Sequence, residues 1–335
     1  MGRCDNVAAV TTPTPAPRRF RWGTAVRAVA GVAIIAVVVT RVPLRDLAAR
    51  FAQMRASDVA ILVFLACLQM STGVGRWWRL LSRVGERPPL SAVCRDLLVG
   101  ALFNTFLPTS FGGDVVRAIR MSRRLEAPHR AWSTSLFERL VGLLTLALAG
   151  AVAALFVMGN ALPSRQRVVI VCVALALGVA FFFASTPLRI LVGVLEKRLP
   201  SAFIADVRGV VADLEGPLTK TALRLETFAW SLSGFLASVV YVLAGARALG
   251  AAEFGLAAVV GLPIVSVLSI APVSLGGHGL REGLFVVVLG MLGVPKDVAL
   301  GIALIALAYN IFFALLGGAV SLVEPTTRVK AVTQA

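Results

Sequence analysis

Long apolar runs recur along this sequence, and they restrict it to one class of protein. A helix needs roughly 20 apolar residues to cross a bilayer. Of the 335 residues, 58% are hydrophobic and only 15% are charged, whereas a soluble domain carries about 25% charged residues. The pattern predicts an all-α integral membrane protein with about six transmembrane helices. The expected crossings cover residues 24–40, 58–80, 132–158, 168–184, 228–249 and 298–323.

Both ends of the chain are polar. Residues 1–23 are rich in proline and arginine, which predicts a disordered basic tail. The apolar run that follows is similar to a signal peptide, but Thr40-Arg41-Val42-Pro43 stands in place of a small-residue cleavage site. We therefore interpret this run as a retained first helix. The sequence predicts a single membrane domain over residues 24–324 and a C-terminal tail over residues 325–335.

The net charge of +16 has two interpretations, either nucleic-acid binding or basic loops at the cytoplasmic face of a membrane. Because the chain is so apolar, we favour the second and expect no nucleic-acid partner. Both termini are then cytoplasmic, and we expect a multi-pass protein of the plasma membrane. The expected cytoplasmic segments are 18–27, 76–95, 117–130, 187–224 and 328–330.

Two basic segments near the membrane ends of helices need separate interpretation. Residues 41–55 carry four arginines yet fall on the outer side, which conflicts with this orientation. Their apolar residues recur at helical spacing and predict an amphipathic helix on the membrane surface. The paired tryptophans of Arg76-Trp77-Trp78-Arg79 are typical of the headgroup layer.

Metal and disulfide chemistry is not expected. The four cysteines form no CxxC pair, and His129 and His278 are the only histidines. We therefore predict no metal site and no cofactor.

Two further apolar segments are interrupted in the middle. The first, at about 91–120, is broken by Pro108-Thr-Ser-Phe-Gly-Gly113, and the second, at about 256–293, is broken between Ala271 and Gly279. Each apolar half is too short to cross a bilayer. Each segment is therefore predicted to form a re-entrant hairpin, in which a half-helix enters the membrane, turns and returns.

The two interruptions share the pattern P-x-S-x-G-G-x-x-x-R. It runs from Pro108 to Arg117 and again from Pro272 to Arg281. Three expected crossings separate the hairpins, so the second enters from the side opposite to the first. This arrangement is an inverted repeat, with both tips near the midplane. The alternative is an ordinary turn at each place, with arginines that reach the headgroups.

The residue types at these tips suit the binding of an anion. Proline ends the entering half-helix, and the glycine pair lets the backbone approach a ligand. Serine can cap the returning half-helix, whose N-terminus attracts negative charge. An arginine one turn later can form a forked contact with phosphate. The candidate binding residues are Ser110, Gly112, Gly113 and Arg117 in the first copy and Ser274, Gly276, Gly277 and Arg281 in the second.

Other charged residues near the tips have two interpretations each. Asp114 and His278 hold equivalent places in the two copies, and His278 could titrate near neutral pH or be purely structural. The pairs Glu138-Arg139 and Arg281-Glu282 could bind a headgroup or could neutralise themselves inside the protein. We retain all of them as candidate binding residues.

With these motifs together, the chain resembles the lysylphosphatidylglycerol synthase transmembrane-region family, also described as flippase-like membrane proteins. The resemblance rests on N-x-x-L-P-x-x-x-G-G-D-x-x-R (Asn104–Arg117), E-R-x-x-G (Glu138–Gly142) and P-x-S-x-G-G-x-G-x-R-E (Pro272–Glu282). It covers roughly residues 25–325 and adds Asn104 to the candidate binding residues.

The resemblance implies a membrane domain that moves lipids between leaflets. In full-length synthases it implies flipping of an aminoacylated phosphatidylglycerol made by a separate soluble domain. That domain is missing from this sequence, so we expect no synthase activity. The implied partners are a membrane phospholipid or isoprenoid lipid, and a lipid-modifying enzyme could accompany the chain.

The function predicted from the sequence is a lipid flippase or scramblase for an anionic or phosphate-bearing headgroup. A midplane site between the two hairpins would replace the water that a charged headgroup loses in hydrocarbon. No G-x-x-x-x-G-K-[ST] motif for a nucleotide is present. Two alternatives stay open, a membrane-embedded lipid-modifying transferase or hydrolase and a non-transporting partner of a lipid-modifying enzyme. No catalytic motif in the sequence supports the transferase or hydrolase alternative.

Overall fold

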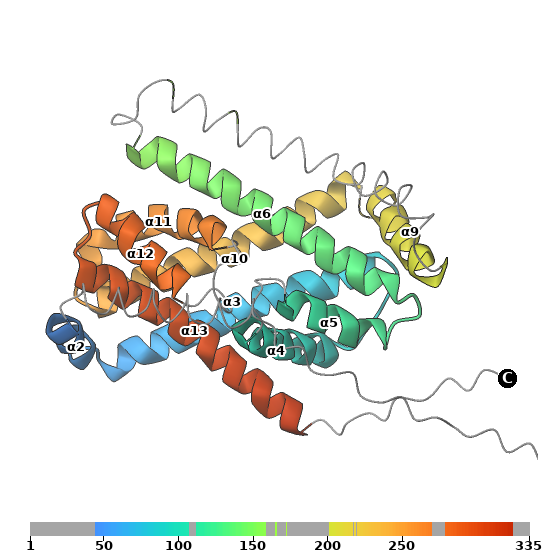
Figure 1. The fold of residues 1–335 in the computed structure, drawn as a ribbon, viewed down its shortest axis with the longest axis horizontal. Helices are drawn as coiled ribbons and strands as arrows, with labels where there is room; N and C mark the ends of the chain where they lie inside the picture. The colour runs from blue at the N-terminus through green and yellow to red at the C-terminus, as the bar shows by residue number, and fades with distance from the viewer. Residues whose placement is uncertain are drawn as a thin grey trace, which may run out of the picture.

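The computed structural model describes residues 44–106, 112–158, 165, 172, 201–216, 218, 220–269 and 279–323, and every regular element among them is a helix (Figure 1). The predicted all-α class is therefore confirmed for this part of the chain. The helices are α2 (Leu44–Ala52), α3 (Ala56–Arg83), α4 (Leu90–Phe106), α5 (Gly112–Ser122), α6 (His129–Met158), α9 (Ser201–Glu215), α10 (Thr221–Ala248), the 3₁₀ helix η2 (Ala252–Phe254), α11 (Gly255–Leu268), α12 (Leu280–Met291) and α13 (Lys296–Val323).

Four helices, α3, α6, α10 and α13, are long and apolar enough to cross a membrane. They coincide with four of the six predicted crossings. Large apolar side chains project outward from them, such as Phe64 at 67% exposure and Leu315 at 69%. An apolar outer surface of this kind is typical of helices that face lipid. The other two predicted crossings, 24–40 and nearly all of 168–184, lie outside the described residues, as do the predicted tails.

The first interrupted segment consists of two helices in backbone contact, α4 and α5. A Cβ atom on Gly113 would lie 2.1 Å from the carbonyl oxygen of Gly100, so only glycine permits this approach. Near the interruption, the Gly113 N–H donates to Asn104 Oδ1 at 2.7 Å. Toward the far end, the fully buried Asp96 of α4 accepts hydrogen bonds from Arg120 and Arg124.

The second interrupted segment is also a pair of packed helices, α11 and α12. Gly261 faces Leu289 so closely that an added Cβ would lie 2.6 Å from the leucine Cδ2 atom. Gly279, at φ +81°, precedes α12, and its N–H donates to Glu282 Oε2 at 2.6 Å. Both helices belong to a large apolar core that they share with α3, α10 and α13.

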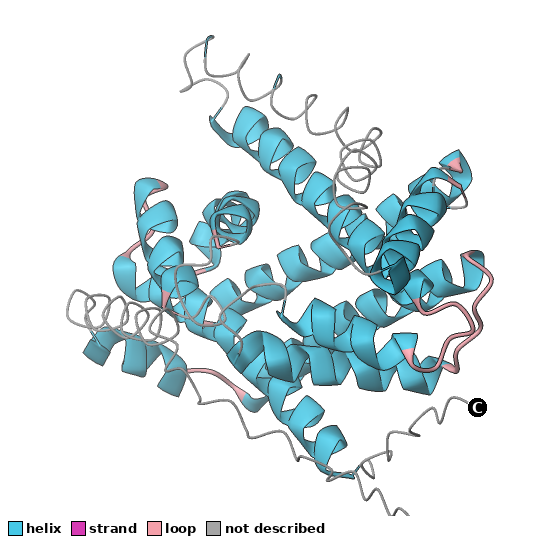
Figure 2. Cartoon of the chain, turned by 45° about the vertical axis from the view of Figure 1, so that its right-hand side comes forward, coloured by secondary structure: helices cyan, strands magenta, loops and turns pink. Residues whose placement is uncertain are grey.

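The two short pairs lie toward opposite ends of the long helices (Figures 1 and 2). At one end, Glu86 precedes α4 and accepts hydrogen bonds from the Ala127 N–H and Arg130, which follow α5. At the other end, Arg50 of α2 donates to the Leu249 carbonyl at 3.1 Å and to Asp297 at 2.6 Å. Those two residues flank the α11–α12 pair in the sequence.

The Arg50 contact bears on the basic segment that conflicted with the predicted orientation. The predicted amphipathic helix in 41–55 is present as α2. Its Arg50 is neutralised by Asp297, which is 10% exposed at its side chain. This arginine therefore has a structural role within the protein, because it ties α2 to the start of α13.

The contact between α13 and α4 yields a stability prediction. A Cβ on Gly317 would lie 2.0 Å from the Leu98 carbonyl oxygen, whereas a Cβ on the neighbouring Gly318 would meet only Leu102 Cδ1 at 3.8 Å. Overpacking a backbone contact costs about 1–3 kcal/mol. We expect Gly317→Ala to lower the unfolding midpoint of the detergent-purified protein.

The matched control for this prediction is Gly318→Ala. Alanine has the higher helix propensity, so this variant should leave the midpoint unchanged or raise it. Equal midpoints for the two variants would contradict the described packing of α13 on α4.

Candidate functional site

A cavity of about 510 Å³ lies among the four long helices. Residues near the middle of each long helix line this cavity. They lie within 69–76 of α3, 138–146 of α6 and 231–238 of α10, and α13 contributes Tyr309 and Asn310. Residues beside both interrupted segments complete it. These are Asn104, Asp114 and Arg117 from α4 and α5 and Ser266, Ser269 and Arg281 from α11 and α12. Residues 164 positions apart in the repeat, Arg117 and Arg281, thus line one cavity.

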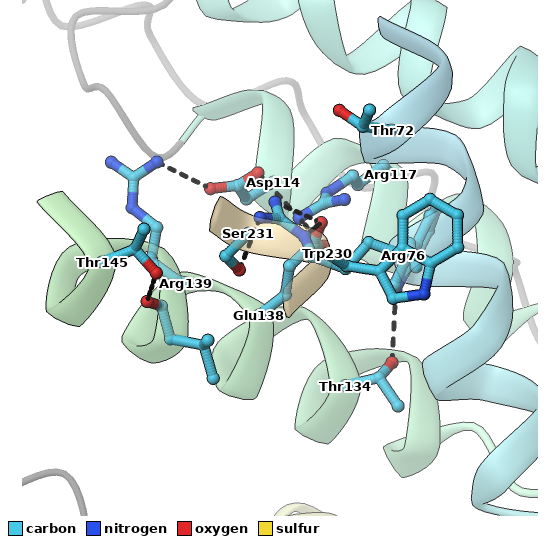
Figure 3. Close-up of polar contacts among 12 residues, drawn as sticks. Thr72, Arg76, Asp114, Arg117, Thr134, Glu138, Arg139, Thr145, Trp230 and Ser231 are labelled. Carbon is cyan, nitrogen blue, oxygen red and sulfur yellow. Dashed lines mark hydrogen bonds and ion pairs between the residues drawn. The ribbon is translucent and has the colours of Figure 1, made fainter. Parts of the chain in front are cut away.

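Glu138 is the centre of a buried ion network in this cavity (Figure 3). Its Oε1 atom lies 2.7 Å from Arg76 Nη2, and its Oε2 atom lies 2.8 Å from Arg117 Nη2. The side chain of Glu138 is 3% exposed and that of Arg117 is 6% exposed. The carboxylate therefore connects α3, α5 and α6. Arg76 Nη1 also donates a hydrogen bond to Ser231 Oγ at 2.9 Å, which extends the network to α10.

Asp114 is the second carboxylate of the network. Its Oδ1 atom lies 3.1 Å from Arg117 Nη2, and its Oδ2 atom lies 3.5 Å from Arg139 Nη1. Figure 3 shows Asp114 between these two arginines. Each carboxylate in the cavity lining is therefore paired with two arginines.

Trp77 supports the network from behind. The Arg117 guanidinium lies 4.6 Å from the centre of the Trp77 ring, a distance suited to a cation–π contact. Trp77 is fully buried, and its Nε1–H donates to Thr134 Oγ1 at 3.3 Å. The interpretation of Arg76 and Trp77 as residues that face the headgroup layer is therefore wrong. Both side chains are directed into the helical bundle.

Arg281 differs from the other cavity arginines. In the described part of the chain no carboxylate forms an ion pair with it, and its guanidinium lies 5.9 Å from the centre of the Phe285 ring. Its sequence neighbour Glu282 is buried and accepts the Gly279 N–H, so it caps its own helix and is not part of the cavity lining. Glu282 forms no direct ion pair with Arg281, and its charge acts on the guanidinium only over a longer distance.

The remaining predicted residues fall into two groups. Gly112 and Gly113 are buried where α5 begins and are not among the lining residues, and Gly113 packs against α4. Ser110, Ser274, Gly276, Gly277 and His278 lie outside the described residues.

Sequence reasoning missed several cavity residues. Arg76 was assigned to the membrane surface, and polar residues such as Gln69, Ser231 and Asn310 were passed over. A signal existed, because polar side chains in the middle of an apolar span are costly and mark functional positions. Among the residues that the structure describes, four arginines and two carboxylates line the cavity, which gives an excess of two positive charges.

One comparison with known proteins identifies the family of the chain. The family model described as "Lysylphosphatidylglycerol synthase TM region" matches residues 25–318, which confirms the resemblance. No curated protein is significantly similar to the chain. The family is one of membrane proteins tied to lipid metabolism or transport. With a match over most of its length, this chain belongs to the lysylphosphatidylglycerol synthase transmembrane-region family.

Proposed function

We propose that the chain is a lipid flippase or scramblase, in which an anionic or phosphate-bearing headgroup passes through the arginine-lined cavity. The observation that carries this proposal is a positively charged cavity near the middle of four candidate membrane spans. An ionised group in hydrocarbon costs several kcal/mol or more unless it finds a partner. A cavity with an excess of positive charge lowers that cost for a phosphate.

The proposal includes an inverted pair of re-entrant hairpins. Its support is that α4 and α5 both join the end of the bundle near Glu86, whereas α11 and α12 both join the end near Arg50. Residues beside the two breaks line the same cavity. In inverted-repeat transporters, such breaks form the substrate site, and movement of one repeat against the other opens it to each side in turn.

The charge network explains how several arginines can stay ionised inside a membrane. Glu138 and Asp114 lower the cost of burying Arg76, Arg117 and Arg139, and they fix the positions of the guanidinium groups. Both oxygens of Glu138 are engaged by arginine, so it is poorly suited to act as a general base. We therefore favour transport over a transferase, with no covalent bond made or broken in the lipid.

Filling the cavity provides a test of transport. Gly142 lines the cavity, and a Cβ there would meet no atom within 4 Å. We expect Gly142→Trp to fold but to block passage of a headgroup. The measurement is the rate at which a fluorescently labelled phosphatidylglycerol becomes accessible to a membrane-impermeant quencher in liposomes that contain the purified protein.

The matched control is Gly290→Trp, because Gly290 is exposed, has the same open space and lies outside the cavity lining. The wild type and this control should accelerate transfer relative to protein-free liposomes, and Gly142→Trp should not. Transfer by the wild type at the protein-free rate, across several anionic lipids, would exclude a flippase. It would leave the non-transporting partner as the better hypothesis.

The hairpin arrangement predicts the sides on which four exposed residues lie. Arg87 and Arg123 flank α4 and α5, and Glu253 and Lys296 flank α11 and α12. With the native cysteines replaced by serine, single cysteines at the first two positions should react with an impermeant maleimide from the cytoplasmic side. Those at the last two should react from the outside. Labelling of Arg87→Cys and Arg123→Cys from opposite sides would mean that the α4–α5 segment crosses the membrane.

A further inference from the structure

We propose that the cavity selects a phosphodiester headgroup that carries hydroxyl groups and no amine, an inference that rests on the proposed flippase function and narrows its substrate class. A glycerol- or other polyol-phosphate lipid has this chemistry. An aminoacylated or otherwise cationic headgroup does not. The argument concerns which charges and hydrogen-bonding atoms of the cavity are already engaged.

The carboxylates of the cavity are not available to a cationic headgroup. Glu138 has one arginine on each oxygen, at 2.7 and 2.8 Å, and its side chain is 3% exposed. Asp114 likewise has an arginine near each oxygen, at 3.1 and 3.5 Å. An ammonium group would have to displace a guanidinium from one of them. It would also meet an excess of two positive charges among the described lining residues.

The available charge is that of Arg281. It lines the cavity, is partly buried and has no ion pair with a carboxylate in the described part of the chain. A guanidinium can bind two oxygens of a phosphodiester through parallel hydrogen bonds. The Tyr309 ring and Asn310 side chain of α13 line the same cavity. We therefore assign the phosphate to Arg281.

The hydroxyl groups of the cavity are oriented to accept hydrogen bonds. Ser266 donates its proton to the Leu262 carbonyl at 2.7 Å, Ser238 to Gly234 at 3.0 Å and Thr145 to Val141 at 2.8 Å. Each oxygen keeps lone pairs that can accept a hydrogen bond from a ligand. A ligand hydroxyl can donate to them, whereas a doubly ionised phosphate monoester or a trimethylammonium group offers no donor. This favours a polyol over phosphatidic acid or phosphatidylcholine.

Binding of competing lipids to the full-length protein tests the inference without a transport assay. Native mass spectrometry would measure the occupancy of phosphatidylglycerol, phosphatidic acid, phosphatidylcholine and lysyl-phosphatidylglycerol with identical acyl chains. We expect phosphatidylglycerol to bind best, and lysyl-phosphatidylglycerol and phosphatidylcholine to bind about tenfold more weakly. Because Gly142→Trp fills the cavity, it should abolish this preference and leave only binding to the outer surface.

Two substitutions separate the phosphate and hydroxyl contributions. Arg281→Gln should reduce phosphatidylglycerol to the level of phosphatidylcholine, and Arg281→Lys should retain part of the preference. Ser266→Ala should weaken phosphatidylglycerol relative to phosphatidic acid by several-fold. The control is Arg83→Gln, because Arg83 is 50% exposed, pairs with Glu226 outside the cavity lining and should not alter the preference. Unfolding midpoints would verify that each variant is folded.

Lysyl-phosphatidylglycerol occupancy equal to or above that of phosphatidylglycerol would overturn the inference. So would a preference that survives both Arg281→Gln and Gly142→Trp, since it would come from the outer surface. A polyol preference in a protein that does not accelerate transfer in liposomes would leave the binding assignment standing and refute the flippase alone. Transfer of all four lipids at equal rates and with equal occupancy would refute the selectivity alone.

Discussion

The architecture around the cavity depends on one buried carboxylate. Glu138 holds Arg76 and Arg117 within hydrogen-bonding distance and so connects α3, α5 and α6. Removal of one partner from a buried ion pair costs about 3–5 kcal/mol, because the other charge is left without compensation. In a low-dielectric interior this penalty makes the three side chains act as a unit. The unit therefore ties together three of the helices that line the cavity.

Glycine contacts determine how close the short helices come to that unit. Gly100 and Gly113 let α4 and α5 touch, and Gly317 lets α13 reach the backbone of α4. Asp114 follows Gly113 directly and Arg117 lies about one turn later, and both side chains form ion pairs with α6. Packing of small residues replaces the hydrophobic effect as the source of helix association in lipid. Ionic contacts then provide the specificity that apolar packing in a bilayer lacks.

Much of this arrangement could be predicted from the sequence, because the signals were local. The length of the apolar runs predicted the four long helices. The repeated P-x-S-x-G-G-x-x-x-R pattern predicted that Arg117 and Arg281 belong to one site, and both line the same cavity. The role of Arg76 was not predictable in this way. Its partner Glu138 lies 62 residues away on another helix, and no spacing rule connects them. The local sequence around Arg76 and Trp77 is typical of the headgroup layer, but packing between helices buries Trp77 and pairs Arg76 with Glu138.

The sequence pattern also could not predict which side chains bind to the backbone instead of to a ligand. Glu282 follows Arg281 directly, and the sequence alone could not distinguish a binding carboxylate from a helix cap. The distinction depends on the backbone at Gly279, whose positive φ angle directs its N–H toward the Glu282 side chain. The partner of Arg50 in the basic segment before α3 could not be predicted either. It is Asp297, which lies 247 residues further along the chain.

The central claim is that a lipid headgroup enters the cavity between the two interrupted segments. The most direct measurement uses a phospholipid with a photoreactive diazirine in its headgroup, cross-linked in membranes and mapped by mass spectrometry. The account predicts adducts on lining segments 69–76 and 142–146 and near Arg281. Adducts confined to outward-facing positions such as Phe64 and Leu315, with none on the lining, would contradict it.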